Sequence, residues 1–118
     1  MKSKLYKNLD VRVKNILLIS EGWLVGNSIN NILNDEEVKD YDIIAPNREL
    51  YHKILFLSGS NYQFSINSYG GVKLQIDNYG NDTLSIDIWC EDLSHFIENA
   101  KEINYLYNYK RNVLLKNI

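Results

Sequence analysis

The segment Lys39-Asp40-Tyr41-Asp42-Ile43-Ile44-Ala45 carries two acidic residues one position apart, and they lead directly into an apolar run that Pro46 ends. In a β-strand, residues two positions apart point to the same face of the sheet. Asp40 and Asp42 are therefore expected on one face at the start of a strand whose remainder is buried. Two ionised carboxylates held side by side repel each other unless a positive charge offsets them, and a divalent cation commonly does so. The segment thus predicts a strand that presents a pair of metal ligands.

A third acidic residue, Asp87, lies in a second segment with the alternation of a strand, residues 83–89. Asp87 falls on the face opposite the apolar one, in mid-strand, where aspartate is disfavoured. We expect it on a strand near Asp40 and Asp42, where it would complete a site of three carboxylates. A structural alternative makes Asp40 a turn residue and pairs the other acids with bases, namely Lys39 or Arg48 for Asp42 and Lys73 for Asp87.

The first part of the chain predicts a helix followed by a buried strand. Residues 2–15 combine lysine and arginine with apolar residues. This pattern fits either a solvated first helix or a basic arm that contacts a nucleotide or an RNA backbone. The apolar run Ile16-Leu17-Leu18-Ile19 predicts a short central strand.

Residues 20–28 predict a turn that leads into a helix. Gly22 and Gly26 permit a tight turn, and Asn27 or Ser28 can cap the helix that follows. A strand, a glycine turn and a helix start can together bind phosphate, because free backbone N–H groups face outward there. A plain strand-turn-helix connection has the same pattern.

The rest of the chain predicts two further helices and several antiparallel strands. Asn47 is a good N-cap for one helix, and Asp92 or Ser94 for the other. Residues 62–66 and 72–76 alternate like paired strands. The tail from Ile103 fits a helix loosely, but its alternating tyrosines favour a hairpin with its turn at residues 109–112.

The composition describes one globular domain of 118 residues with a formal net charge of −2. Such a chain is not built as a whole to bind nucleic acid, although local patches can be. Cys90 is the only cysteine, which excludes an internal disulfide and a cysteine-based zinc site and fits a reducing cytoplasm. His52 and His95 are not spaced as metal ligands. No apolar run approaches the ~20 residues of a membrane-spanning helix.

The order of these elements resembles the nucleotidyltransferase superfamily of DNA polymerase β-like proteins. It is similar above all to the head domain of bacterial poly(A) polymerases and class II CCA-adding enzymes, in a minimal stand-alone form. In that family a strand precedes a glycine-glycine or glycine-serine motif, and a helix then leads to a Lys-Asp-hydrophobic-Asp-hydrophobic strand. The matching segments are Ile16 to Leu33, Lys39-Asp40-Tyr41-Asp42-Ile43, and Ile66-Asn67-Ser68-Tyr69-Gly70-Gly71-Val72-Lys73-Leu74 with Ile86-Asp87-Ile88-Trp89.

The resemblance implies an α+β nucleotidyltransferase fold with a mixed, mostly antiparallel sheet and flanking helices, in one domain over residues 1–118. It implies transfer of an NMP group from an NTP to a hydroxyl acceptor, which can be a small molecule, a protein or RNA. Two Mg²⁺ ions, about 3.5–4 Å apart, would clamp the attacking and leaving oxygens. Asp40 and Asp42 would hold both ions, and Asp87 would hold the catalytic ion and accept the proton of the attacking hydroxyl.

The same resemblance assigns the nucleotide contacts to Gly22, Gly26, Asn27 and Lys73. Glu21 stands where the family usually has the first glycine of its pair or, if the motif is shifted by one residue, Trp23 stands where serine belongs. The arginine common a few residues further on is absent. A carboxylate beside a triphosphate is unfavourable unless a metal or a base offsets it. These departures suggest an alternative function, a catalytically degenerate member of the fold that binds a protein partner as an antitoxin or an inhibitor.

Overall fold

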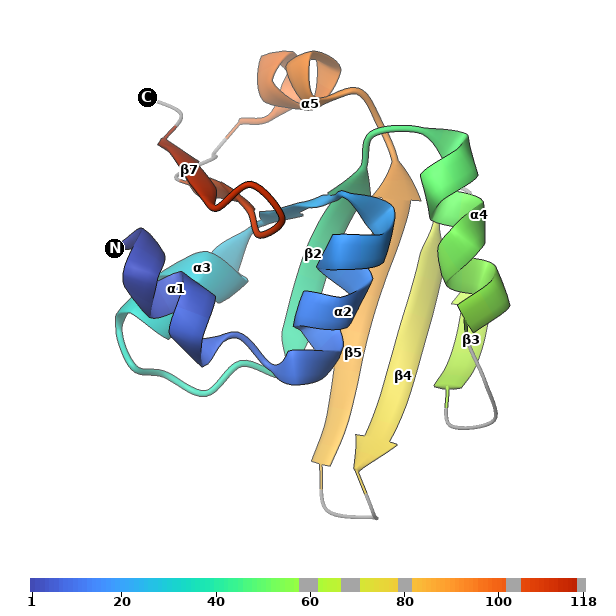
Figure 1. Cartoon of the computed structure of the whole chain (residues 1–118), viewed down its shortest axis with the longest axis horizontal. Helices are drawn as coiled ribbons and strands as arrows, with labels where there is room; N and C mark the ends of the chain where they lie inside the picture. The colour runs from blue at the N-terminus through green and yellow to red at the C-terminus, as the bar shows by residue number, and fades with distance from the viewer. Residues whose placement is uncertain (58–61, 67–70, 79–81, 102–104, 117–118) are drawn as a thin grey trace.

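The strand predicted from the two acidic residues is β2 (Asp40–Ala45), and it is the middle strand of a seven-stranded sheet of order β3-β4-β5-β2-β1-β6-β7. The computed structural model describes residues 1–57, 62–66, 71–78, 82–101 and 105–116 (Figure 1). β2 pairs in parallel with β5 (Asp82–Cys90) and antiparallel with β1 (Trp23–Val25). The other strand pairs in the described chain are antiparallel, so the predicted α+β fold with a mixed, mostly antiparallel sheet is confirmed.

The remaining elements continue this sheet and cover it. The helices are α1 (Lys2–Asn8), α2 (Val11–Ser20), α3 (Asn27–Leu33), α4 (Arg48–Leu57) and α5 (Leu93–Asn99), and the outer strands are β3 (Tyr62–Ile66), β4 (Val72–Asn78), β6 (Tyr105–Asn108) and β7 (Val113–Lys116). Within the described part of the chain, no helix is long and apolar enough to cross a membrane.

The strand predicted at Ile16-Leu17-Leu18-Ile19 is wrong, because these residues form the second half of helix α2. Asp10 begins the helix, and its carboxylate accepts a hydrogen bond from the backbone N–H of Arg12 at 2.8 Å. The buried residues follow helical spacing, at Val13, Ile16, Leu17 and Ser20. Tertiary packing of this stripe therefore outweighs the local resemblance of four consecutive apolar residues to a strand.

The predicted turn over residues 20–28 is also corrected, since its middle forms strand β1. Gly22 precedes this strand and lies so close to β2 that an added Cβ would be 2.9 Å from the carbonyl oxygen of Ile44. Gly26 is the N-cap of α3, with a positive φ of 83°, and no side chain caps the helix. Asn27 and Ser28 therefore lie inside the helix and do not cap it.

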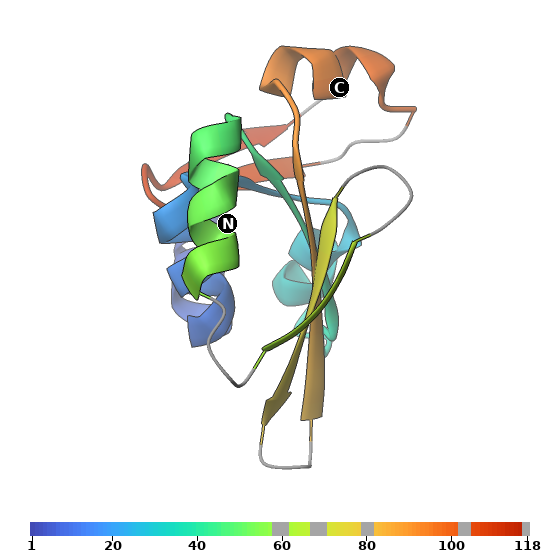
Figure 2. The ribbon, with the colours of Figure 1, turned by 90° about the vertical axis from the view of Figure 1, so that its right-hand side faces the viewer.

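The main core lies between the sheet and the helices α1, α2 and α3. Tyr41 and Ile43 of β2 belong to it, together with the apolar residues of β4 and β5 that alternate along those strands. Each fully buried leucine or isoleucine there contributes about 1.5–3 kcal/mol relative to an exposed one. Figure 2 shows α4 on one side of β4 and β5.

The opposite face of the sheet carries a smaller apolar cluster. Val25, Ile44 and Leu106 are buried there, and partly buried side chains of α5 pack against them. Asp92 caps α5 by accepting hydrogen bonds from the N–H groups of Ser94 and His95, at 2.9 and 3.3 Å. Among the described elements, none covers the lower halves of β2 and β5 on this face (Figure 2).

Two local predictions are confirmed by hydrogen bonds. Asn47 accepts a bond of 2.9 Å from the N–H of Leu50 at the start of α4. The tail forms the predicted hairpin of β6 and β7, where the Tyr107 hydroxyl donates to Asn112 Oδ1 at 2.7 Å across the turn. The segment from Ile66 to Leu74 was compared above with small relatives of the head domain. Residues 67–70 of this segment lie outside the described residues.

Candidate functional site

Asp42 and Asp87 lie directly opposite each other on adjacent strands. The parallel register of β2 and β5 pairs Asp42 with Asp87 and Asp40 with Ser85. The antiparallel register of β4 and β5 pairs Asp87 with Lys73. Paired residues point to the same face of a sheet. Asp42, Asp87 and Lys73 therefore form a row across three strands, on the face opposite the main core.

The environment of Asp42 disfavours its negative charge. Burial raises the pKa of its carboxyl, the neighbouring charges of Asp87 and Asp40 raise it further, and Lys73 lowers it by a smaller amount. Asp42 and Asp87 are half-buried, whereas Asp40 is exposed. A cation placed between the carboxylates would offset both the desolvation and the repulsion.

The structural alternative for these acids is not found. In the part of the chain that the structure describes, the ion pairs involve neither Asp42 nor Asp87. Lys73 affects Asp42 only through space, and no ion pair joins it to Asp87 across the strands. The two half-buried carboxylates therefore lack a basic partner among the described side chains.

Gly26 brings the backbone against the carboxylate of Asp42. A Cβ added to Gly26 would lie 2.9 Å from Asp42 Oδ2, and the φ of 83° disfavours any residue with a side chain. The chain order here is β1, Gly26, α3 and β2, which is the order expected around the family's glycine motif. Gly26 and Asn27, and not Glu21 and Gly22, therefore occupy the turn between strand and helix.

Glu21 and Gly22 lie elsewhere in the structure. Glu21 ends helix α2 in a left-handed conformation, and its carboxylate is bonded to the Lys110 ammonium group. This bond lowers the pKa of the Glu21 carboxyl. The positive charges of Lys110, Arg111 and Lys53 lower the same pKa further. Gly22 is buried and donates its N–H to Ser20 Oγ at 3.1 Å. The expected conflict between Glu21 and a bound triphosphate therefore does not arise at the Gly26 turn.

A cavity of about 420 Å³ lies beside the carboxylates. Its lining combines the start of α3, the loop before β2 and the first residues of β2, namely Asn27, Ser28, Asn31, Glu37, Val38, Lys39, Asp40 and Asp42. The buried hydroxyl of Ser28 has no hydrogen-bond partner among the described residues, and the same holds for Ser85 opposite Asp40. A buried polar group without a partner is costly, so a polar ligand would gain from contact with Ser28.

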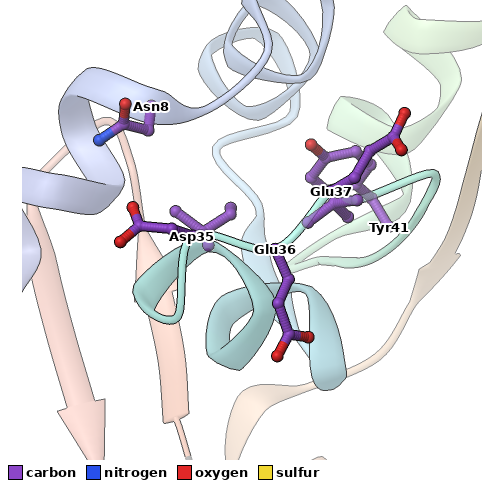
Figure 3. Close-up of a pocket in the computed structure, with 7 residues that line it drawn as sticks. Asn8, Asp35, Glu36, Glu37 and Tyr41 are labelled. Atoms are coloured by element: carbon purple, nitrogen blue, oxygen red, sulfur yellow. The ribbon is translucent and has the colours of Figure 1, made fainter.

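A second cavity of about 450 Å³ adjoins the same loop, on the side of Tyr41. Figure 3 shows that the carboxylates of Asp35, Glu36 and Glu37 point in different directions. Asp35 forms an ion pair of 2.9 Å with Lys4. These acids therefore do not converge on a common point. Tyr41 also lines this cavity, and burial raises the pKa of its hydroxyl to about 12.

The carboxylates suit a magnesium ion only in part. Among the described residues, no three Asp, Glu, His or Cys side chains are grouped so that they could hold one ion. Mg²⁺ is often held by one or two carboxylates together with water and substrate phosphates, however. The pair Asp42 and Asp87 fits that requirement, because its charges face each other without a basic partner. Asp40 lies on the same strand face but is exposed.

Comparison with known proteins gives a match at the level of structure. No protein-family model matches the sequence, and no curated protein does. The fold matches a CCA-adding enzyme solved in complex with CTP, with a TM-score of 0.66 and 13% identity over 98% of this chain and 31% of that one. It also matches a CCA-adding enzyme in complex with ATP, with a TM-score of 0.58 and 15% identity over 79% of this chain and 24% of that one.

The chain thus spans about a quarter to a third of the length of these enzymes. At such low identity the likeness establishes the fold alone. The α+β architecture, the central Asp-x-Asp strand and the glycine turn before α3 all agree with the resemblance expected from the sequence. The chain has a nucleotidyltransferase-like fold, similar to part of the CCA-adding enzymes.

Proposed function

We propose that this domain is a Mg²⁺-dependent nucleotidyltransferase that transfers an NMP group from an NTP to a hydroxyl acceptor. The observation that carries the proposal is the placement of Asp42 opposite Asp87, on the uncovered face of the sheet and against Gly26. Two half-buried carboxylates without a basic partner cost stability, and function is a physical reason to keep such an arrangement.

Asp42 and Asp87 would hold the metal, and Asp40, exposed on the same strand face, would add negative charge at the mouth of the site. Bound Mg²⁺ would neutralise the charge that develops on the phosphoryl oxygens. Asp87 would accept the proton of the acceptor hydroxyl, a role for which its carboxylate must be ionised. Lys73, which stands opposite Asp87 in the register of β4 and β5, would balance negative charge on the nucleotide.

The phosphates would approach the chain at the Gly26 turn. Gly26 has no side chain to block this approach, and Asn27 and Ser28 line the adjoining cavity. Gly22 is not part of this surface, because it is buried and its N–H is already bonded to Ser20. The nucleotide contacts are therefore assigned to Gly26, Asn27 and Lys73, and Ser28 is added as a hydroxyl donor.

Calorimetric titration of the protein with each of the four NTPs, with and without Mg²⁺, tests the proposal. Mg²⁺-dependent binding of an NTP is expected, and Asp42→Ala should weaken it at least tenfold. Pyrophosphate release in the presence of candidate acceptors then measures turnover. Asp10→Ala is a matched control, since Asp10 caps α2 and pairs with Arg12 on another part of the molecule. Absence of Mg²⁺-dependent NTP binding would refute the proposal.

A catalytically inactive, partner-binding role is the second candidate. The observation in its favour is the charge of the cavity, whose described lining residues present three carboxylates and one basic side chain, that of Lys39. A triphosphate would meet little positive charge there without metal. If Asp42→Ala and Asp87→Ala leave the biological effect of the protein intact, this second role is correct. Turnover that depends on both acids would exclude it.

A further inference from the structure

A second surface of the molecule combines stacked aromatic rings with basic side chains. Tyr6 of α1 stacks on Tyr109 of the β6–β7 turn, with ring centroids 5.1 Å apart and an interplanar angle of 20°. Lys14 of α2 lies over both rings, with Nζ 5.8 Å from each centroid. Figure 1 shows the β6–β7 turn beside α1 and α2. The tertiary fold assembles the cluster by placing the turn that carries Tyr109 against α1 and α2, which are at the other end of the chain.

Further basic residues extend this cluster along the turn. Lys110 and Arg111 follow Tyr109 directly in the sequence. These two residues and Lys53 of α4 are close enough to Glu21 to lower the pKa of its carboxyl. Glu21 is paired with Lys110. Among the described side chains, Lys14, Lys53 and Arg111 take part in no ion pair. We call Tyr6, Lys14, Lys53, Tyr109, Lys110 and Arg111 the basic–aromatic surface.

The charge of this surface contrasts with that of the rest of the molecule. The chain as a whole has a net charge of −2, and the carboxylates of the candidate site and of the loop before β2 lie around the other cavities. Positive charge is thus concentrated where α1, α2 and the hairpin turn meet, and Lys53 of α4 is near the same region through its effect on Glu21. A basic patch on an acidic protein attracts a polyanion locally.

We propose that the basic–aromatic surface binds a single-stranded polynucleotide. Tyr6 keeps 47% of its surface exposed while one face lies against Tyr109, so a base can stack on the ring. Lys14, Lys53 and Arg111 would contact successive phosphates. The aromatic rings favour a polynucleotide over an acidic protein, and base faces are available for stacking only in a single strand.

Fluorescence anisotropy with a labelled 12-nucleotide single-stranded RNA, and with the DNA of the same sequence, tests this proposal. Binding should weaken steeply with salt, and Lys14→Gln and Arg111→Gln should each reduce the slope of log K against log salt by about 0.7. Tyr6→Leu should weaken binding about 5- to 100-fold, because a stacked base is lost. Comparison of the two strands shows whether ribose contributes.

Lys101→Gln is the matched control, because Lys101 is an exposed lysine that follows α5 and is not part of this surface. It should leave affinity and slope within twofold of the wild type. Circular dichroism must show that each variant is folded, and Tyr6→Phe should retain binding if the ring is what matters. Asp42→Asn should bind the strand as the wild type does, so the result is independent of the proposed transferase activity.

Three outcomes would overturn the proposal. The first is no binding at about 50 mM salt. The second is that the double variant Lys14→Gln/Arg111→Gln binds the strand with the affinity of the wild type. The third is equal competition by a duplex of the same sequence or by polyglutamate, which would mean that the surface recognises charge alone.

Discussion

At the scale of single residues, Asp42 is where stability and the proposed function conflict. Its carboxyl is half-buried opposite Asp87, and both burial and that neighbouring charge raise its pKa. A carboxyl whose pKa is higher in the folded than in the unfolded protein binds more protons when folded. Stability is therefore lost as pH rises from 3.8, the ordinary pKa of an aspartate, through the raised pKa of the folded state.

Asp42→Asn should therefore stabilise the protein at pH 7 in the absence of divalent cations. Removal of one like charge from a cross-strand pair is worth roughly 0.2–1 kcal/mol. Urea unfolding at pH 4, 5, 6 and 7 should show that the loss of stability with rising pH is smaller in the variant. Asp40→Asn, at an exposed position of the same strand, is the control with a smaller effect. A variant less stable than the wild type at pH 7 would contradict the placement of Asp42.

Gly26 is the second residue whose role the geometry makes testable. Gly26→Ala should destabilise the protein by about 1–3 kcal/mol, because the φ is 83° and the new Cβ would lie 2.9 Å from Asp42 Oδ2. Thermal unfolding of Gly26→Ala, Asp42→Ala and the double variant forms a cycle. The double variant should be more stable than the sum of the two effects implies, because the steric conflict is removed in the Asp42→Ala background. Strict additivity would mean that the two residues are not in contact.

At the scale of elements, helix α2 decides how the N-terminal part packs. Its buried face carries Val13, Ile16, Leu17 and Ser20, and the Ser20 hydroxyl donates to the Ile16 carbonyl oxygen at 2.7 Å. The central strand expected from the sequence would have been covered on both faces, so that Leu17 and Leu18 would both be buried. In the helix, Leu17 is fully buried and Leu18 is 44% exposed.

This difference makes two adjacent leucines a test of the element. Leu17→Ala should cost about 2–5 kcal/mol, as large-to-small changes in a core do. Leu18→Ala should cost no more than about 0.5 kcal/mol, because the side chain is at the surface. Denaturant unfolding of both variants distinguishes the helix from a strand. Similar losses for both leucines would contradict the helix.

At the scale of the whole molecule, the site depends on the pairing of β2 with β5. These two strands are separated in the sequence by α4, β3 and β4. A cation held by Asp42 and Asp87 would link these two strands in the folded state alone. By mass action, free Mg²⁺ at about 100 times its dissociation constant would stabilise the protein by about 2.7 kcal/mol.

Calorimetric unfolding in MgCl₂ and in KCl of equal ionic strength should show this stabilisation. The rise in unfolding temperature should occur in the wild type and be lost in Asp42→Asn/Asp87→Asn. Arg12→Gln, which leaves the carboxylates of β2 and β5 in place, should retain the rise. An equal response of the wild type and the double variant would mean that Mg²⁺ acts elsewhere on the protein.

Several elements could be predicted from the sequence because their signal is local. The acidic pair before an apolar run identified β2, alternation identified β4 and β5, the tyrosines identified the final hairpin, and side-chain caps identified the starts of α4 and α5. Alternation also determined which face of β5 carries Asp87. These features depend on neighbours two to four residues away, and such neighbours are visible in the sequence.

Three other features could not be predicted from local patterns, because each depends on contacts between residues that are far apart in the chain. Packing against the sheet made Ile16 to Ile19 part of a helix, although four apolar residues in a row look like a strand. Residues 23–25 of the predicted turn form β1, because they pair with β2, and the turn before α3 is therefore at Gly26 and not at Gly22. The parallel register of β2 and β5 set Asp87 opposite Asp42 and not opposite Asp40, and no local pattern specifies the register between distant strands.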